Sequence, residues 1–110
     1  ISMSTSAMNI KFENQGLDAR YAVIFTSIKK DINPDYEEMA NRMLELVATQ
    51  EGFLGSRSFR NSSGEGVTIS YWKSLGSIKS WRQNKEHQAA INRGITEWYS
   101  WYQVEIVEIK

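Results

Sequence analysis

The segment from residue 70 to 87 holds the side chains of this chain best suited to chemistry. His87 is the single histidine, and an imidazole titrates at about pH 6.5, so it could take a proton from a phenol or hydroquinone. Trp81 belongs to the same segment and could wall an aromatic ligand. Two structural alternatives stand beside this hypothesis. Trp81 could simply fill the core, and His87 could cap a break at Asn84 or face solvent.

Other chemically useful groups are few. Arg57 and Arg60 could hold an anion bidentately, although arginines of hairpins are usually solvated. The chain has no cysteine and one histidine, which excludes a disulfide, a thiolate metal site and a multi-histidine site within one chain. No phosphate loop or nucleophile elbow occurs. We therefore expect neither a metal nor a cofactor.

Length and charge set the outer limits. The 110 residues fit one domain, and 13 basic residues balance 13 acidic ones, which removes the electrostatic case for nucleic acid or an anionic membrane. No segment approaches the roughly 18 apolar residues of a membrane span. The start has no basic residue and no apolar core, so it does not resemble a secretory signal. A cytoplasmic protein is the expectation.

The elements that must position these residues follow from periodicity. Residues 1–19 lack a pattern and predict a flexible arm before a domain at 20–110. Residues 21–28 predict a strand that is apolar on both faces. Asn33 as cap and Pro34 at the first position predict a helix over 34–50.

Two strands, a helix and a last strand complete the pattern. We expect strands at 53–60, with a bulge at Gly55, and at 67–72, where Trp72 packs under a helix. A helix beginning near Ser74 buries Leu75, Ile78 and Trp81, weakens around Asn84 and continues to about Trp98, with Gly94 as a possible kink. A final strand covers 101–109.

This order, strand, helix, strand, strand, helix, strand, predicts an α+β fold of the ferredoxin-like βαββαβ type. Its antiparallel sheet carries both helices on one face. Because the first strand is apolar on both faces, the outer face also needs a cover. A second copy of the chain, sheet against sheet, is the simplest one.

Five segments together resemble the antibiotic biosynthesis monooxygenase family: YAVIFTS, QEGFLGSRSFR, GVTISYW, SWRQNKEHQAA and WYSWY. The resemblance covers about residues 20 to 109 and implies a dimeric α/β barrel with a pocket between sheet and helices in each subunit. Similar members include cofactor-independent monooxygenases of aromatic polyketides, and others degrade haem.

The haem-degrading branch fits less well. The tryptophan of that branch matches Trp81, but its asparagine falls near Phe25 to Ser27, where no asparagine occurs, and its histidine falls at about Ile91. His87 lies one turn earlier on the same helix face as Ile91, which leaves a displaced ligand open.

The leading hypothesis is therefore a cofactor-independent monooxygenase of a small aromatic or quinone-like compound, with a non-catalytic binding module as the rival. We assign His87 and Trp81 as catalytic residues. We assign four residues to substrate binding, namely Phe25, Ser27, Tyr71 and Trp72.

Overall fold

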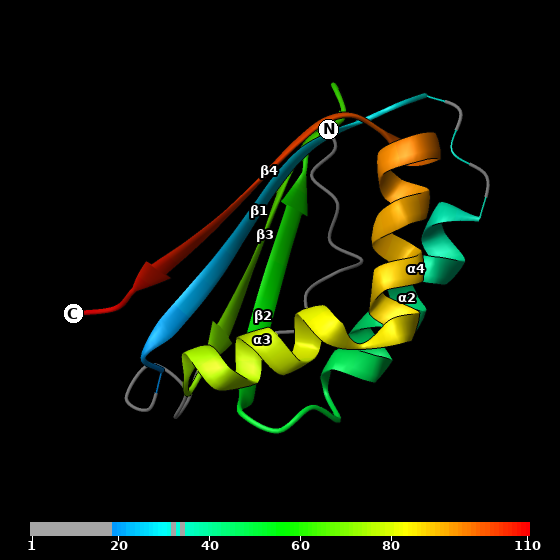
Figure 1. Cartoon of the computed structure of the whole chain (residues 1–110). Helices are drawn as coiled ribbons and strands as arrows, with labels where there is room; N and C mark the ends of the chain where they lie inside the picture. The colour runs from blue at the N-terminus through cyan, green and yellow to red at the C-terminus, as the bar shows by residue number, and fades with distance from the viewer. Residues whose placement is uncertain (1–18, 32, 34) are drawn as a thin grey trace.

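The computed structural model describes residues 19–31, 33 and 35–110. Four strands form one antiparallel sheet in the order β2-β3-β1-β4: β1 (Tyr21–Lys29), β2 (Phe53–Arg60), β3 (Glu65–Trp72) and β4 (Tyr99–Glu108). The helices α2 (Tyr36–Val47), α3 (Leu75–Gln83) and α4 (Lys85–Arg93) lie to one side of it (Figure 1). The predicted ferredoxin-like fold is confirmed. The expected flexible arm falls outside the described residues except for Ala19, which is buried.

The core joins one end of the sheet to α2 and α3. Val47, Trp72, Ile78 and Trp81 are buried together, with partly buried apolar side chains packed against them: Tyr21, Val23, Met43, Leu46 and Phe53. Trp72 has no exposed surface, and its indole N–H donates to Ser70 Oγ at 2.9 Å. Trp72 thus packs under a helix as expected. Leu75, expected to be buried, is 53% exposed.

The first helix differs from the prediction at both ends. It runs over Tyr36–Val47 instead of 34–50, and its cap residue is Asp35, with φ of 64° and no side-chain capping bond. The expected cap, Asn33, instead donates its side-chain amide to the carbonyl of Asp31 at 2.9 Å. The prediction for Pro34 falls outside the described residues. After the helix, Gly52 adopts a φ of 86°, the left-handed conformation that commonly ends helices.

The second predicted helix is divided where its pattern weakens. Ser74 caps α3 by accepting the backbone N–H of Ser77, and Asn84 caps α4 by accepting that of His87. A short π-helical turn, η1 (Gly94–Trp98), begins at the glycine expected to kink the helix. None of the helices in the described ranges has the length and apolarity that a membrane crossing needs.

Register assigns side chains to the two faces. Tyr21, Val23, Phe25 and Ser27 lie on the helix side of β1, and their β4 partners on that side are Glu108, Ile106, Val104 and Tyr102. A bulge between Phe53 and Gly55 shifts the register of β2, so both Phe53 and Arg60 lie on the helix side. Two backbone hydrogen bonds join the strands at the corner where β1 begins and β4 ends. The N–H of Arg20 donates to the carbonyl of Trp72, and the N–H of Ile109 donates to the carbonyl of Arg20.

Candidate active site

The two residues predicted to be catalytic lie together. The rings of Trp81 and His87 stack with their centroids 4.0 Å apart and an interplanar angle of 23°. The Asn84 side chain accepts the backbone N–H of His87 and so fixes the first turn of α4, in which the imidazole packs on Trp81 of α3. His87 is thus half-buried and does not cap the break with its side chain, whereas Trp81 does fill the core, as its structural alternative proposed.

The imidazole of His87 is held in its neutral form. Burial lowers its pKa from an ordinary 6.5 to about 4, and the positive charge of Arg82 adds to the shift. Its Nδ1 atom is buried without a hydrogen-bond partner among the described residues. A buried polar atom without a partner is costly, and a catalytic role is one of the reasons why a folded protein keeps such an atom.

An open groove lies between α3 and the helix side of β4. Its volume is about 370 Å³, and it is lined by Leu75, Ile78, Lys79, Arg82, Gln83 and Ile106. Ile78 also packs against Trp81 in the core, and Arg82 lies close enough to His87 to lower its pKa. The Trp81–His87 stack thus lies behind the α3 wall of this groove.

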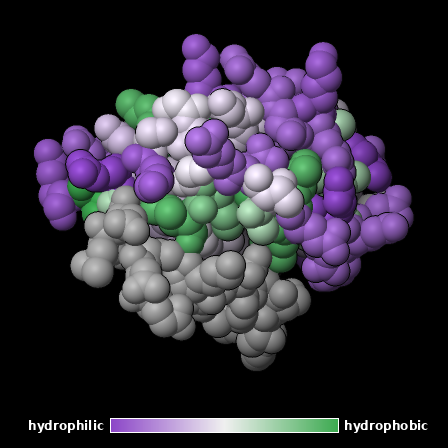
Figure 2. All heavy atoms as spheres, turned by 90° about the horizontal axis from the view of Figure 1, so that it is seen from below, coloured by the Kyte–Doolittle hydropathy of each residue, from purple (hydrophilic) through white to green (hydrophobic). Residues whose placement is uncertain are grey.

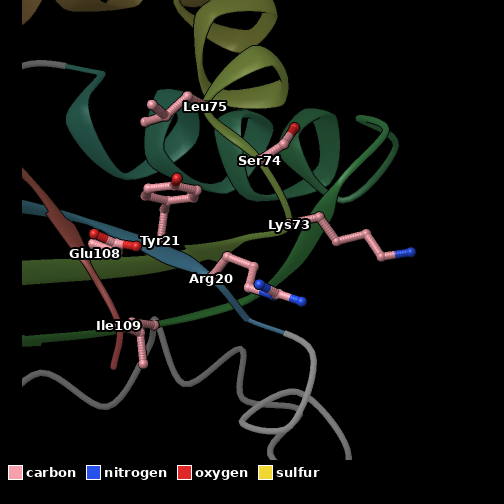
Figure 3. Close-up of a pocket in the computed structure, with 7 residues that line it drawn as sticks. All are labelled: Arg20, Tyr21, Lys73, Ser74, Leu75, Glu108 and Ile109. Carbon is pink, nitrogen blue, oxygen red and sulfur yellow. The ribbon is translucent and has the colours of Figure 1, made fainter.

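A second hollow of about 520 Å³ adjoins the first through Leu75. It lies at the end of the sheet where β1 begins and is lined by Arg20, Tyr21, Lys73, Ser74, Leu75, Glu108 and Ile109. In Figure 3 the ring of Tyr21 points from β1 towards Leu75, whereas Ile109 lies on the other side of the strand. Seen from this end of the molecule, apolar residues form a band across the centre with hydrophilic residues at both sides (Figure 2).

The floor of the groove continues along β4 in exposed apolar side chains. Tyr102, Val104 and Ile106 are 42%, 45% and 40% exposed although they lie on the helix side of the sheet. Phe25 of β1 lies beside this row, with its ring 6.2 Å from that of Tyr102 and 5.4 Å from that of Tyr99. This half-exposed row on the helix side is therefore an apolar surface suited to a flat ring.

The four residues assigned to substrate binding are not brought together. Phe25 borders the exposed row, but Ser27 and Trp72 have no exposed surface and can touch a ligand only if their neighbours move. Tyr71 pairs with Ala22 on the opposite face of the sheet from Phe25, so it cannot line the same pocket. Tyr71 and Trp72 could not both have lined one pocket, because adjacent strand residues point to opposite faces.

One group of polar residues on the helix side was missed as a set. Arg60 donates to Ser27 Oγ at 2.9 Å and to the Tyr36 hydroxyl at 3.4 Å. Tyr99 is largely buried there, which raises its pKa, as does hydrogen bonding with Tyr36, while Arg60 opposes the shift. The sequence drew attention to Arg60 as an anion ligand, but only the bulge in β2 turns it towards Ser27.

The site contains no assembled metal centre within the described ranges. No group of three or more His, Asp or Glu side chains there is close enough to hold an ion. Ile91, at the position expected of a haem ligand, is 40% exposed. What the site does offer is a neutral imidazole stacked on one indole, and an open groove whose lining combines apolar side chains with Lys79 and Arg82.

Comparisons with known proteins agree with this architecture. SnoaB, a cofactor-independent oxygenase from Streptomyces nogalater, has a TM-score of 0.71 at 11% identity over 84% of this chain and 94% of that chain. Rv0793 from Mycobacterium tuberculosis has a TM-score of 0.73 at 13% identity over 84% of this chain and 96% of its own. At these identities the likeness concerns the fold.

Sequence similarity is closer to the uncharacterized protein YqjZ of Bacillus subtilis (strain 168). The two chains are 46% identical over 89 residues, which is 81% of this chain and 78% of that protein. Residues 20–93 match the family model described as antibiotic biosynthesis monooxygenase. With the fold, the groove and these matches combined, the chain belongs to the antibiotic biosynthesis monooxygenase family.

Proposed function

We propose that this protein is a cofactor-independent monooxygenase that oxidises a small aromatic or quinone-like compound lying in the groove between α3 and β4. The observation that carries the proposal is the stack of His87 on Trp81, with Nδ1 buried and unpartnered within the described residues. In such a reaction the substrate supplies the electrons. When a ring methylene becomes a carbonyl, one oxygen atom enters the product and the other leaves as water with the two hydrogens.

The first requirement is loss of a proton from the substrate, because a phenolate or carbanion reacts with oxygen far more readily than the neutral molecule does. His87 is neutral at pH 7 and therefore free to accept a proton. Its low pKa makes it a weak base. The negative charge that forms on a bound substrate would raise that pKa, and Lys79 and Arg82 at the groove would stabilise the same charge.

The second requirement is a flat, apolar place for the ring. Leu75 and Ile78 of α3 supply a wall with Trp81 packed behind Ile78, and the exposed row of β4 with Phe25 supplies a floor. Aromatic side chains favour offset or edge-on contacts with an aromatic ligand. Closing this surface with a ligand also removes water, which strengthens every charge interaction inside.

Oxygen uptake tests this function. The intact protein is screened against hydroquinones and fused-ring methylene compounds, and the best substrate is then compared in variants. His87→Ala should lower kcat about 100-fold, the low end of general-base effects, because the base is weak. Trp81→Phe should raise KM more than it lowers kcat, since it weakens ground-state and transition-state binding alike.

Lys85→Ala, on the same helix as His87, is the matched control and should leave both constants unchanged. Turnover by His87→Ala at the wild-type rate would remove the histidine from the mechanism. Ligand binding without oxygen uptake across the panel would instead support a non-catalytic binding module.

We also propose that the protein works as a homodimer joined through the outer face of the sheet. Ala22, Ile24 and Ile28 lie on that face of β1, and the exposed Trp101 and Val107 lie on that face of β4. A second copy of the same face would remove this apolar surface from water.

A further inference from the structure

The helix side of the sheet ends in a cluster of four side chains contributed by four different elements. They are Ser27 of β1, Tyr36 of α2, Arg60 of β2 and Tyr99 of β4. Arg60 is their centre: one terminal nitrogen donates to Ser27 Oγ at 2.9 Å and the other to the carbonyl of Gly64 at 2.6 Å. Its guanidinium carbon lies 5.9 Å from the ring centres of both Tyr36 and Tyr99.

Two glycines make room for this cluster. A Cβ at Gly66 would lie 2.5 Å from Cζ of Arg60, and a Cβ at Gly94 would lie 2.6 Å from Cε2 of Tyr99. Both distances are too short for any side chain to coexist with the present positions of Arg60 and Tyr99. The guanidinium lies across a bare stretch of β3, so its location depends on the absence of a side chain at Gly66.

The positive charge of the cluster is not balanced. Nζ of Lys29 lies 4.5 Å from the ring centre of Tyr36, which adds a second cation. The ion pairs among the described residues involve neither Arg60 nor Lys29. The acceptors of Arg60 are two hydroxyls and backbone carbonyls, all neutral. A half-buried guanidinium is normally paired with a carboxylate or phosphate, and the described part of the chain supplies neither to Arg60.

We infer that this cluster binds the carboxylate of an aromatic acid whose ring lies on the exposed row of β4. The terminal N–H of Arg60 that makes the weak 3.4 Å bond to Tyr36 is the donor that a carboxylate oxygen would take over, while the bonds to Ser27 and Gly64 hold the guanidinium in place. Phe25 and Tyr102 lie next to the cluster and offer the surface for the ring. Binding of the acid is argued independently of the proposed function. Only the statement that this acid is the molecule being oxidised rests on that function.

Salicylate is a suitable probe because it carries both an aromatic ring and a carboxylate. Its Kd for the full chain is measured by calorimetry beside those of 2-hydroxybenzyl alcohol, which lacks the charge, and acetate, which lacks the ring. We expect salicylate to bind at least about 10-fold more tightly than either compound. The alcohol loses the charge-assisted hydrogen bond to Arg60, and acetate loses the ring contact. Equal binding of acetate would overturn the aromatic part, and equal binding of the alcohol would overturn the ionic part.

Two variants act on Arg60 in different ways. Arg60→Gln removes the charge, and Gly66→Ala keeps the charge but forces the flexible end of Arg60 to move. Each should raise the Kd of salicylate at least about 10-fold. The matched controls are Arg42→Gln, an exposed arginine of α2, and Gly76→Ala, where a Cβ meets open space apart from Ser74 Oγ at 3.8 Å. Unchanged affinity in both Arg60→Gln and Gly66→Ala would overturn the inference.

A measurement on the wild-type protein guards against misfolded variants. Phenylglyoxal modifies accessible arginines, and mass spectrometry locates the product. Salicylate should slow modification of Arg60 but not of Arg42, and equal rates would count against the site. Oxygen uptake separates the two proposals: neutral quinols turned over by a protein that binds no aromatic acid would refute this site and leave the proposed function intact.

Discussion

His87 couples the candidate active site to the pH dependence of stability. Its pKa is about 4 in the folded protein, whereas an unfolded chain restores a value of about 6.5. Above pH 6.5 both states are neutral and no proton is exchanged. Between about pH 6.5 and 4, His87 binds a proton in the unfolded state but not in the folded state. The free energy of unfolding therefore falls as the pH is lowered.

The variant His87→Phe should remove this dependence while keeping a ring on Trp81. Urea unfolding at pH 7 and at pH 4.5 gives the loss of stability in each protein, and the carboxylates contribute equally to both. We expect the free energy of unfolding to fall further in the wild type than in His87→Phe. The difference should be at most about 3 kcal/mol, and smaller if solvent reaches the imidazole. Identical losses in the two proteins would mean that His87 is solvated in the native state.

At the residue level the sequence predicts candidates better than it predicts orientation. His87 and Trp81 were singled out from their types and from the family resemblance, and the structure stacks their rings. Arg60 could not be placed because its side of β2 depends on one irregularity. In a regular strand Phe53 and Arg60 would face opposite ways, and the bulge at Gly55 brings both to the helix side.

The break between α3 and α4 is the element on which the site geometry depends. Asn84 ends α3 in an extended conformation with ψ of 126°, and its side chain accepts the N–H of His87 at 2.9 Å. An Asn→Ala change at such a cap costs about 1 kcal/mol. Asn84→Ala should therefore lower the free energy of unfolding by about that amount, whereas Asn84→Asp keeps an acceptor and should change it little.

Denaturant unfolding of both variants measures the difference. Because α4 carries His87, Asn84→Ala should also loosen the ring from Trp81, which near-ultraviolet circular dichroism of the tryptophans would register. A fully stable Asn84→Ala with an unchanged spectrum would show that packing alone sets the angle between the helices.

The elements themselves were largely readable from the sequence. Alternation and glycine positions place all four strands within two residues of their observed ends, and the largest differences are the earlier starts of β3 and β4. The helix boundaries were harder. Asp35, with its φ of 64°, begins α2 instead of Asn33, and no local rule favours a left-handed aspartate over an asparagine cap. Leu75 follows the apolar period of α3 but lines the two hollows beside β4 instead of packing into the core.

At the scale of the whole molecule, the dimer proposal can be tested by comparing two valines of β4 that lie on opposite faces of the sheet. Val107 faces the outer side of β4 and Val104 the helix side, and they are 38% and 45% exposed. A stable interface buries more than about 1,000 Å², and a lysine at its centre leaves a charge without water. Val107→Lys should therefore yield monomers, and Val104→Lys should remain dimeric.

Light scattering at micromolar concentration reports the mass in each case. A wild-type mass of one chain would reject the dimer outright. Dissociation by Val104→Lys instead of Val107→Lys would move the interface to the helix side, where it would compete with the proposed substrate surface.

The corner at which β1 begins and β4 ends has a mechanical consequence. Tyr21 pairs with Glu108, and the N–H of Ile109 donates to the carbonyl of Arg20 at 2.8 Å, so a pull on Ala19 and Lys110 acts on one end of a ladder. Antiparallel hydrogen bonds are perpendicular to the strands. Tension applied at this end would therefore break the bonds between β1 and β4 one pair at a time, instead of loading all of them in shear. An optical trap should thus record β4 peeling away at low force, and an unfolding motor that grips the carboxyl end would meet little resistance.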